Sequence, residues 1–294
     1  MSWKNESLYL QVSETTKIHY KVNFQKEEVN EDDTILVFNY GLVCNFQHFD
    51  LQVDYFASLG YRILIHDYRN HFDSTSDDGI ESVPFKNICQ DLKTLLNHLG
   101  IKKTIQLGHS MGVNVTLEMA YLYPELVKSM IIISGTVFPP QDIMFDSNVI
   151  DLSEPIILKA KESIGELYSY LWRNAYKNKL AQIGVWSGGF NTKKTSIKWV
   201  EEYMKKIGEL DPDLFFHLLD QMRDHKIINH LESIKTKTLI IGGDKDKIIP
   251  NYLQRVLHRY LKNSSLYIVK DGSHVPQVDF PELINDRINY FISN

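Results

Sequence analysis

The sequence has little cysteine and no long hydrophobic run. Its two cysteines, Cys44 and Cys89, lie far apart and match no zinc-binding spacing, which excludes a disulfide framework and argues against a redox pair. No window approaches the roughly 18 uncharged apolar residues of a membrane-spanning helix. The first residues, Met1 to Glu6, lack the charged segment and apolar stretch of a secretory signal. We therefore expect a cytoplasmic protein without a membrane span.

The chain also lacks an excess or a block of one charge. Its 32 basic and 37 acidic residues give a formal net charge of −5, with both signs interspersed. A nucleic-acid or anionic-membrane surface needs clustered Lys and Arg, so neither partner is expected. The hydrophobic share of 43% and aromatic share of 12% are enough to build a core, and no repeat or low-complexity tract is present. Composition therefore indicates a folded protein and leaves both enzymes and binding modules open.

Most of the chain alternates short apolar strands with amphipathic helices. This alternation predicts a mostly parallel sheet covered by helices on both faces. The expected strands are residues 8–12, 17–23, 34–39, 62–66, 104–107, 128–134, 238–241 and 266–269. The expected helices among them are residues 49–59, 83–99, 110–123 and 281–292.

One long stretch interrupts this alternation. Residues 136–231 contain no convincing strand pattern but several helical ones, at 154–164, 166–182, 195–207 and 212–223. A single crossover helix needs far fewer residues. The pattern therefore predicts a helical lid inserted into a core made of residues 1–135 and 232–294. The alternative is a longer series of ordinary crossover helices.

A motif that carries chemistry follows the strand at 104–107. Gly108-His109-Ser110-Met111-Gly112 fits G-x-S-x-G and stands between that strand and a helix. A nucleophile on so tight a turn adopts a strained backbone, and flanking glycines avoid clashes around it. The alternative is a glycine-rich turn that binds phosphate or only packs, but the dinucleotide fingerprint and the P-loop pattern are both absent. The motif therefore indicates a nucleophilic Ser110.

A serine hydroxyl needs a base within hydrogen-bond reach and a group that orients this base. Later strand ends offer both, because the strand at 238–241 leads to Asp244 and Asp246, and the strand at 266–269 leads to His274. We expect His274 to be the base and Asp246, rather than Asp244, to be the acid. His109 adjoins the nucleophile, but its side chain is expected to point away from Ser110 and to pack.

The order Ser110, Asp246, His274 and the elbow motif resemble the α/β-hydrolase superfamily. Within it, the sequence is similar to capped serine hydrolases, namely carboxylesterases, lipases and carbon–carbon bond hydrolases. Their acid motif, Gly-x-x-Asp with Pro four residues later, selects Asp246 between Gly243 and Pro250. The resemblance covers nearly the whole chain outside the helical insert. It implies the α/β-hydrolase fold, with an eight-stranded, mostly parallel sheet and an inserted helical lid.

The resemblance also implies an oxyanion hole formed by the backbone N–H groups of Leu42 and Met111. The family's usual His-Gly-x is Tyr40-Gly41-Leu42 here, so the hole is retained but the loop departs from the usual pattern at Tyr40. The stretch from Asp67 to Ser74 partly matches a second family motif, Asp-x-Arg-Gly-His-Gly-x-Ser. We expect this stretch to be structural and Cys44, near the oxyanion loop, to be a small buried filler.

Aromatic side chains are frequent in the insert. Individually they are expected to form the lid's own core, but collectively they indicate an apolar acyl or leaving-group pocket. The candidate pocket residues are Tyr40, Trp172, Tyr176, Trp186, Phe215 and Val275, with Phe190 and Phe216 as further aromatic residues of the insert.

Together these patterns predict a serine hydrolase that cleaves small or medium, mainly apolar carboxylic esters through an acyl-enzyme, with no metal and no organic cofactor. Carbon–carbon hydrolases, lactonases, amidases, acyltransferases and perhydrolases remain alternatives, because they share this triad. A hydrolase-like small-molecule receptor is a further alternative. Epoxide hydrolases and haloalkane dehalogenases are disfavoured because their nucleophile would be Asp, whereas position 110 is Ser. No pattern indicates an oligomeric state.

Overall fold

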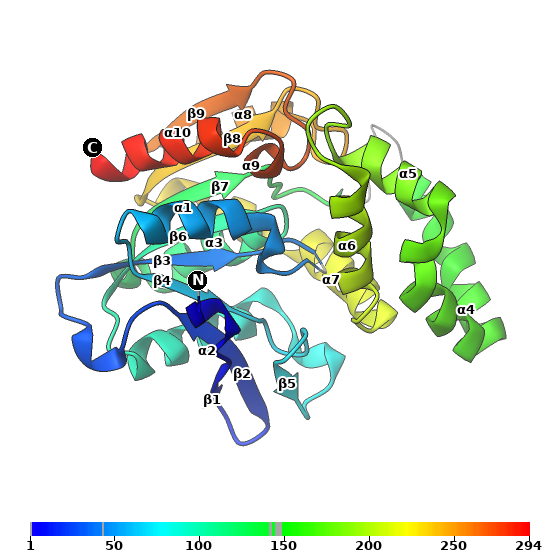
Figure 1. Cartoon of the computed structure of the whole chain (residues 1–294), viewed down its shortest axis with the longest axis horizontal. Coiled ribbons are helices and arrows are strands. Elements are labelled where there is room, and N and C mark those ends of the chain that lie inside the picture. Colours follow the sequence, from blue (N-terminus) through cyan, green and yellow to red (C-terminus); the bar gives the residue numbers. More distant parts are fainter. Residues whose placement is uncertain (1, 43, 141–142, 145–148) are drawn as a thin grey trace.

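A central twisted sheet organises the chain (Figure 1). The computed structural model describes residues 2–42, 44–140, 143–144 and 149–294. In this described part of the chain, eight strands pair in the order β1-β2-β4-β3-β6-β7-β8-β9, and a ninth, β5, pairs with β2. All pairs from β4 to β9 are parallel, and the pairs made by β2 are antiparallel. The strands are β1 (Leu8–Gln11), β2 (Thr16–Val22), β3 (Thr34–Asn39), β4 (Ile63–His66), β5 (Thr75–Ser76), β6 (Lys103–His109), β7 (Val127–Ile133), β8 (Lys237–Gly243) and β9 (Ser264–Val269).

The predicted mostly parallel sheet with helices on its faces is confirmed, and each of the eight expected strands is present. The additional strand β5 has only two residues and lies outside every strand that the sequence predicted. Its pairing with Thr16 and Lys17 of β2 comes from tertiary contact rather than from an apolar pattern in its own sequence.

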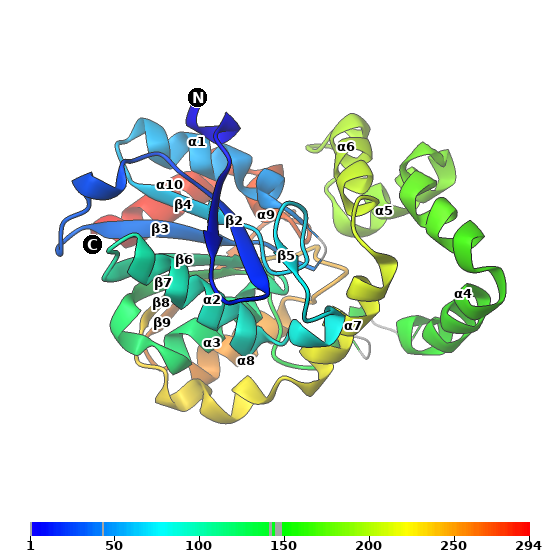
Figure 2. The same ribbon diagram turned by 90° about the horizontal axis from the view of Figure 1, so that it is seen from below.

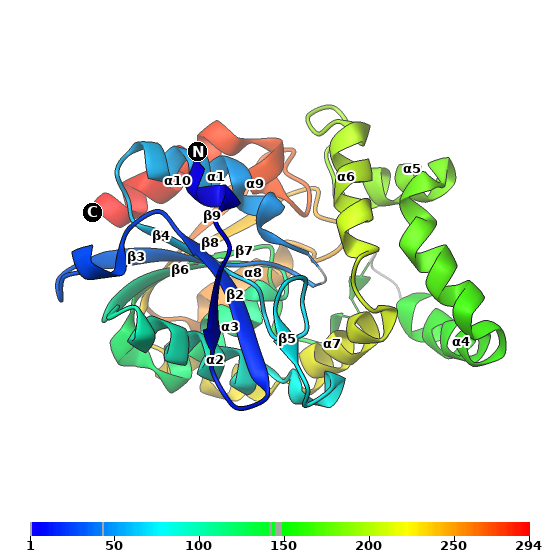
Figure 3. The same ribbon diagram turned by 60° about the horizontal axis from the view of Figure 1, so that its bottom comes forward.

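Helices cover both faces of the sheet (Figure 3). On one face lie α1 (Asp50–Ser58) and α10 (Pro281–Ser293), and on the other lie α2 (Phe85–His98), α3 (Gly112–Leu122) and α8 (Tyr252–Tyr260). The sequence pattern did not indicate α8, whose apolar stripe is short. A four-residue helix, α9 (Pro276–Asp279), precedes α10.

Strand β3 shows why two helical layers are needed. Ile35 and Val37 belong to the hydrophobic cluster under α2 and α3, while Leu36 and Phe38 belong to the cluster under α1 and α10. All four side chains are at most 1% exposed. Because successive side chains of a strand point to opposite faces, this apolar run requires cover on both sides. Each such side chain contributes about 1.5 to 3 kcal/mol by burial.

Among the described residues between β7 and β8, four α-helices are present: α4 (Val149–Asn174), α5 (Lys179–Gly189), α6 (Ile197–Ile207) and α7 (Pro212–Asp224). Helices α4, α5 and α6 stand beyond one end of the sheet (Figures 1 and 2). We call α4 to α7 the helical insertion. No helix in the described part of the chain is long and apolar enough to cross a membrane.

One expected helix of the insertion, residues 166–182, is wrong in its bounds. Helix α4 bends at Gly165, where φ is 35°, and ends at Asn174. A short 3₁₀ turn (Ala175–Lys177) follows, and the Asn178 side chain then accepts hydrogen bonds from the N–H groups of Leu180 and Ala181. Asn is a favoured N-cap residue, so it starts the new helix α5 where the apolar periodicity alone suggests continuity.

Candidate active site

Ser110 occupies the turn between β6 and α3. Its φ of 53° is in the left-handed region, which is unfavourable for a residue with a side chain. Two glycines leave room for the backbone around this turn. A Cβ at Gly112 would overlap the carbonyl oxygen of Asn39, and a Cβ at Gly41 would lie 3.1 Å from the Cβ of Ser110. The two glycines therefore allow the loop after β3 to pass directly against the serine.

His274 lies in the loop after β9 and is oriented by a carboxylate. Its Nδ1 lies 3.0 Å from Oδ2 and 3.2 Å from Oδ1 of Asp246. Asp246 is buried in the loop after β8, and its Oδ1 also accepts hydrogen bonds from the N–H groups of Ile248 and Ile249, at 2.9 and 2.8 Å. Asp244, the other candidate acid, is exposed to solvent. The structure therefore places Asp246 against His274.

Ser110 and His274 line the same cavity. A carboxylate only accepts hydrogen bonds, so Nδ1 of His274 carries the proton that it shares with Asp246. In the neutral ring this leaves Nε2 with a lone pair that can accept a hydroxyl proton. Among the hydrogen bonds of the described residues, none joins Ser110 to His274. Such bonds are commonly long in a free enzyme and shorten when substrate binds.

His109 has a role beyond the packing that the sequence suggested. Its Nε2 donates a hydrogen bond to the backbone oxygen of His274 at 2.9 Å, and the two rings lie 5.0 Å apart. It also lines the cavity together with Ser110, so the expectation that its side chain only packs is incomplete. His109 thus ties the loop of His274 to the serine turn.

The expected oxyanion donors lie on the two segments that meet at Ser110. Leu42 follows β3 and lines the cavity, and Met111 stands at the start of α3. Within the described residues, the hydrogen bonds engage neither of their backbone N–H groups. Both N–H groups are therefore available to an anion, and Met111 adds the favourable end of a helix dipole.

Tyr40 does not line the cavity, which corrects its assignment as a pocket residue. It is 1% exposed, and its hydroxyl accepts a hydrogen bond from the N–H of Tyr68 at 2.9 Å and donates to Oδ1 of Asp67 at 3.4 Å. The hydroxyl of Tyr68 in turn donates to the backbone oxygen of Tyr40 at 2.9 Å. Tyr40 therefore anchors the loop before Leu42 to the stretch that begins at Asp67.

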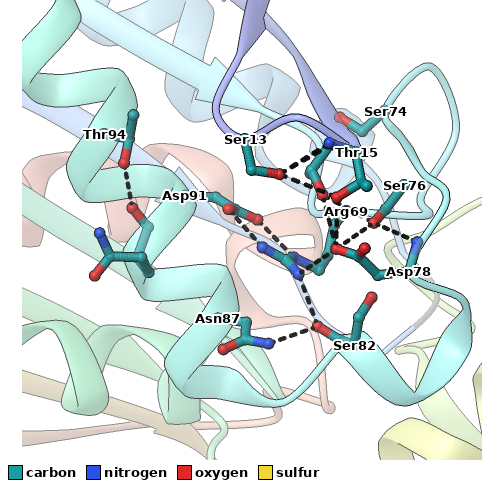
Figure 4. A network of polar contacts seen from close by, with 12 residues as sticks. Ser13, Thr15, Arg69, Ser74, Ser76, Asp78, Ser82, Asn87, Asp91 and Thr94 are labelled. Atoms are coloured by element: carbon teal, nitrogen blue, oxygen red, sulfur yellow. Dashed lines mark hydrogen bonds and ion pairs between the residues drawn. The ribbon is translucent and has the colours of Figure 1, made fainter.

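That stretch is held by a buried ion pair (Figure 4). Arg69 donates from Nε and Nη2 to the two carboxylate oxygens of Asp91, both at 2.7 Å, and from Nη1 to the backbone oxygen of Ser82 at 3.0 Å. Asn87 donates to the same oxygen of Ser82. These contacts fasten the loop to α2. They agree with the structural role that the sequence indicated for it.

The cavity above Ser110 has a volume of about 360 Å³. Three of the expected pocket residues line it: Trp172, Phe215 and Val275. Tyr176 and Trp186 do not; both pack in a hydrophobic cluster that the insertion forms with Val275, and Trp186 donates from Nε1 to the backbone oxygen of Thr195. Phe190, named among the aromatic residues of the insert, also lines the cavity, whereas the sequence analysis did not predict His48, Tyr203 and Met204.

Some titratable groups at the cavity wall are held in their neutral forms. Burial raises the pKa of the Cys44 thiol to about 12, so this thiol does not compete with Ser110 as a nucleophile. Burial, with a smaller effect from His274, lowers the pKa of His48 to about 3. Burial and the neighbouring His274 and His48 hold the pKa of His109 well below its usual range.

The described residues include one group that could hold a metal ion, formed by His19, Asp67 and Asp73. It lies outside the cavity, and Nδ1 of His19 is already paired with Oδ2 of Asp67 at 2.7 Å. The pairing of His19 with Asp67 therefore accounts for this group as part of the polar contacts of the loop that begins at Asp67.

The central sheet, its helical layers and the turn at Ser110 form the fold of the alpha/beta hydrolases. The chain belongs to the alpha/beta hydrolase fold family, whose family model matches residues 34–281. This confirms the resemblance drawn from the sequence.

Individual relatives are distant. The protein ABHD8 of Mus musculus is 21% identical over 266 residues, which cover 88% of this chain and 55% of that protein. The chain therefore spans little more than half the length of this relative. The uncharacterized hydrolase YugF of Bacillus subtilis (strain 168) is 25% identical over 213 residues, which cover 71% of this chain and 72% of that protein.

Solved structures show the same architecture. An esterase from Exiguobacterium antarcticum superposes with a TM-score of 0.77 and 16% identity, over 98% of this chain and 100% of that one. At this level of identity, the similarity demonstrates a shared fold.

Proposed function

We propose that the protein is a serine hydrolase that cleaves carboxylic esters through an acyl-enzyme. The observation that carries this proposal is the placement of Ser110 on a strained turn in one cavity with His274, whose Nδ1 is bound by the buried carboxylate of Asp246. A nucleophile, a base and a group that orients the base are the three parts that acyl transfer by serine requires.

In this proposal the reaction has two halves. Ser110 Oγ attacks the ester carbonyl while Nε2 of His274 takes its proton, and Asp246 stabilises the imidazolium that forms. The N–H groups of Leu42 and Met111 stabilise the tetrahedral oxyanion. His274 returns the proton to the leaving alcohol, and it then activates the water that hydrolyses the acyl-enzyme. These steps need no metal ion and no organic cofactor.

The walls of the cavity favour small or medium, mainly apolar esters. A volume of about 360 Å³ lies at the lower end of the range of small-molecule sites, which run from roughly 300 to 1,000 Å³. Trp172, Phe190, Met204 and Phe215 supply apolar surface, and no charged side chain lines the cavity among the described residues. A neutral acyl or alcohol group of modest size therefore fits best.

We also propose that residues 136–231 act as a lid on the core formed by residues 1–135 and 232–294. Helices α6 and α7 support this proposal, because they contribute Tyr203, Met204 and Phe215 to the cavity. The insertion thus supplies much of the wall that would contact substrate, while the core supplies the reacting groups.

A panel of p-nitrophenyl esters of graded chain length tests the proposal. We expect Ser110-dependent hydrolysis that is fastest for short or medium chains, and a loss of at least about 10³-fold in kcat/KM in Ser110→Ala. Ser58→Ala, at an exposed serine of α1, is the matched control and should retain full activity. Equal rates in the wild type and Ser110→Ala would contradict the proposal.

The alternatives that share the triad are separated by lactone, amide and 1,3-diketone comparators in the same panel. If one of these comparators is hydrolysed faster than every ester, the protein acts on that bond type instead, and the proposed roles of Ser110 and His274 stay the same. Tight ligand binding with negligible turnover would instead indicate a receptor.

A further inference from the structure

Aromatic rings in contact lead from the helical insertion to the loop of His274. On α6, the ring centroids of Trp199 and Tyr203 lie 5.3 and 4.7 Å from that of His48. The ring of His48 lies 5.3 Å from the ring of His109. Nε2 of His109 donates to the backbone oxygen of His274 at 2.9 Å. Centroids about 4.5 to 7 Å apart are typical of packed aromatic pairs. Trp199, Tyr203, His48 and His109 therefore form one continuous set of contacts, which we call the aromatic row.

The aromatic row joins segments that are far apart in the sequence. His48 lies in a 3₁₀ turn (Phe46–Phe49) of the segment after β3, which also carries one of the proposed oxyanion donors. His109 is the last residue of β6 and stands next to the serine turn. The Tyr203 hydroxyl lies 3.5 Å from the Cys44 thiol, which gives α6 a second contact with the segment after β3. Helix α6 is thus in contact with both segments that meet at the proposed nucleophile.

The two histidines of the row make their contacts in different ways. They are 3% and 1% exposed, and burial is the main cause that lowers the pKa of His48 to about 3 and holds that of His109 well below its usual range. Both rings are therefore neutral at pH 7. Within the described residues, neither nitrogen of His48 has a hydrogen-bond partner, so its contacts are those of the ring itself. His109 adds a directed hydrogen bond at the end of the row.

We propose that α6 positions His274 through the aromatic row, so that the insertion sets the rate of the reaction at Ser110 as well as the fit of the ester. Closely packed side chains transmit displacements, and an error of about 1 Å in the position of a catalytic group can cost about 10²-fold in rate. Trp199, His48 and His109 are then positioning residues that act through His274. This inference rests on the proposed ester hydrolysis.

Trp199 is the best probe, because it does not line the cavity among the described residues. With p-nitrophenyl acetate, whose small acyl group makes little contact with the wall, we expect Trp199→Leu to lower kcat by about tenfold and to change KM by less than about twofold. Trp199→Phe keeps a ring against His48 and should restore most of the rate. A residue that only contributes to the fit of the ester would change KM instead.

Phe24→Leu is the matched control for the loss of a buried ring. Phe24 is 7% exposed and follows β2, which runs antiparallel to β4, so it lies at the edge of the sheet opposite Ser110. The substitution should lower the unfolding free energy and leave kcat unchanged. A decrease in kcat that Phe24→Leu shares would reflect stability alone, and it would overturn the inference.

A double-mutant cycle tests the route. His48→Leu should also lower kcat, and Trp199→Leu should add no further loss in that background, because the row is already interrupted. His48→Phe keeps the ring and should keep most of the rate, and the pair His48→Leu and His48→Phe carries the test where Trp199→Leu does not fold. Additive losses, or full kcat in folded Trp199→Leu, would overturn the inference and leave ester hydrolysis intact. No Ser110-dependent hydrolysis of any ester would overturn both proposals.

Discussion

At the scale of single residues, the histidines around the site differ in what surrounds their ring nitrogens. His274 is bound by the carboxylate of Asp246, whereas His48, His66 and His71 are buried. Burial is the main cause that lowers the pKa of His48 to about 3 and those of His66 and His71 to about 4. The folded protein therefore keeps these three rings neutral well below the pH at which they charge in the unfolded chain.

This difference predicts how stability depends on pH. Above about pH 6.5 the three rings are neutral in both states, and their contribution to stability is fully present. As the pH falls toward 4, the unfolded chain binds protons that the folded protein does not. Each ring then removes about 1.4 kcal/mol of unfolding free energy per pH unit.

Urea unfolding at pH 7, 6 and 5 measures this slope. His71→Asn should flatten it by about 1.4 kcal/mol per pH unit between pH 6 and 5, because one buried ring is removed. His98→Asn, at an exposed position, should leave the slope unchanged. The account of the buried rings is wrong if His71→Asn and the wild type have the same slope.

At the scale of elements, one carboxylate joins the helical insertion to the loop of His274. Oδ2 of Asp279, in α9, accepts from the N–H and the hydroxyl of Ser273, at 2.9 and 2.6 Å. Its Oδ1 accepts from the N–H of Asn191 at 3.2 Å and from the hydroxyl of Thr195 at 2.9 Å, both between α5 and α6. Asp279 is 5% exposed, so these bonds are made away from water. The position of the insertion and that of His274 are therefore coupled.

Asp279→Asn tests this coupling, because an amide cannot accept all four hydrogen bonds. We expect it to lower the unfolding free energy by about 2 to 3 kcal/mol and to reduce kcat more than KM, since His274 loses its fixed position. Asp244→Asn, at an exposed position after β8, is the matched control and should change neither quantity. Denaturant unfolding and steady-state kinetics on one ester give both readouts. A loss of stability with unchanged kcat would limit Asp279 to a structural role.

At the scale of the whole molecule, much of the fold could be predicted from local patterns. The runs at β3 and β7 are largely apolar on both faces, so their own sequences predict buried parallel strands. Helix α8 escaped prediction because it has only nine residues, and strand β5 because its two residues are held by tertiary pairing with β2. The start of a new helix after Asn178 was also missed, because it depends on the side chain of a single N-cap residue.

The positions of the proposed reacting groups could also be predicted, because Ser110, Asp246 and His274 each follow directly after a strand. The residues of the cavity wall could be predicted only in part, since Trp172, Phe215 and Val275 were named but His48 and Tyr203 were not. His48 comes from the segment after β3 and Tyr203 from α6, and only the folded chain brings their rings to 4.7 Å. Tyr40 was assigned to the pocket, yet its hydroxyl makes hydrogen bonds with Tyr68 and Asp67 and the residue does not line the cavity.

The central claim is that Ser110 is the nucleophile of an acyl-transfer site, and covalent labelling tests it most directly. The folded protein is treated with a fluorophosphonate and digested, and the modified peptide is identified by mass spectrometry. The account predicts one stoichiometric adduct on Ser110, its absence in Ser110→Ala, and much slower labelling in His274→Ala. An unlabelled Ser110 in folded protein, or an adduct confined to another residue, would contradict it.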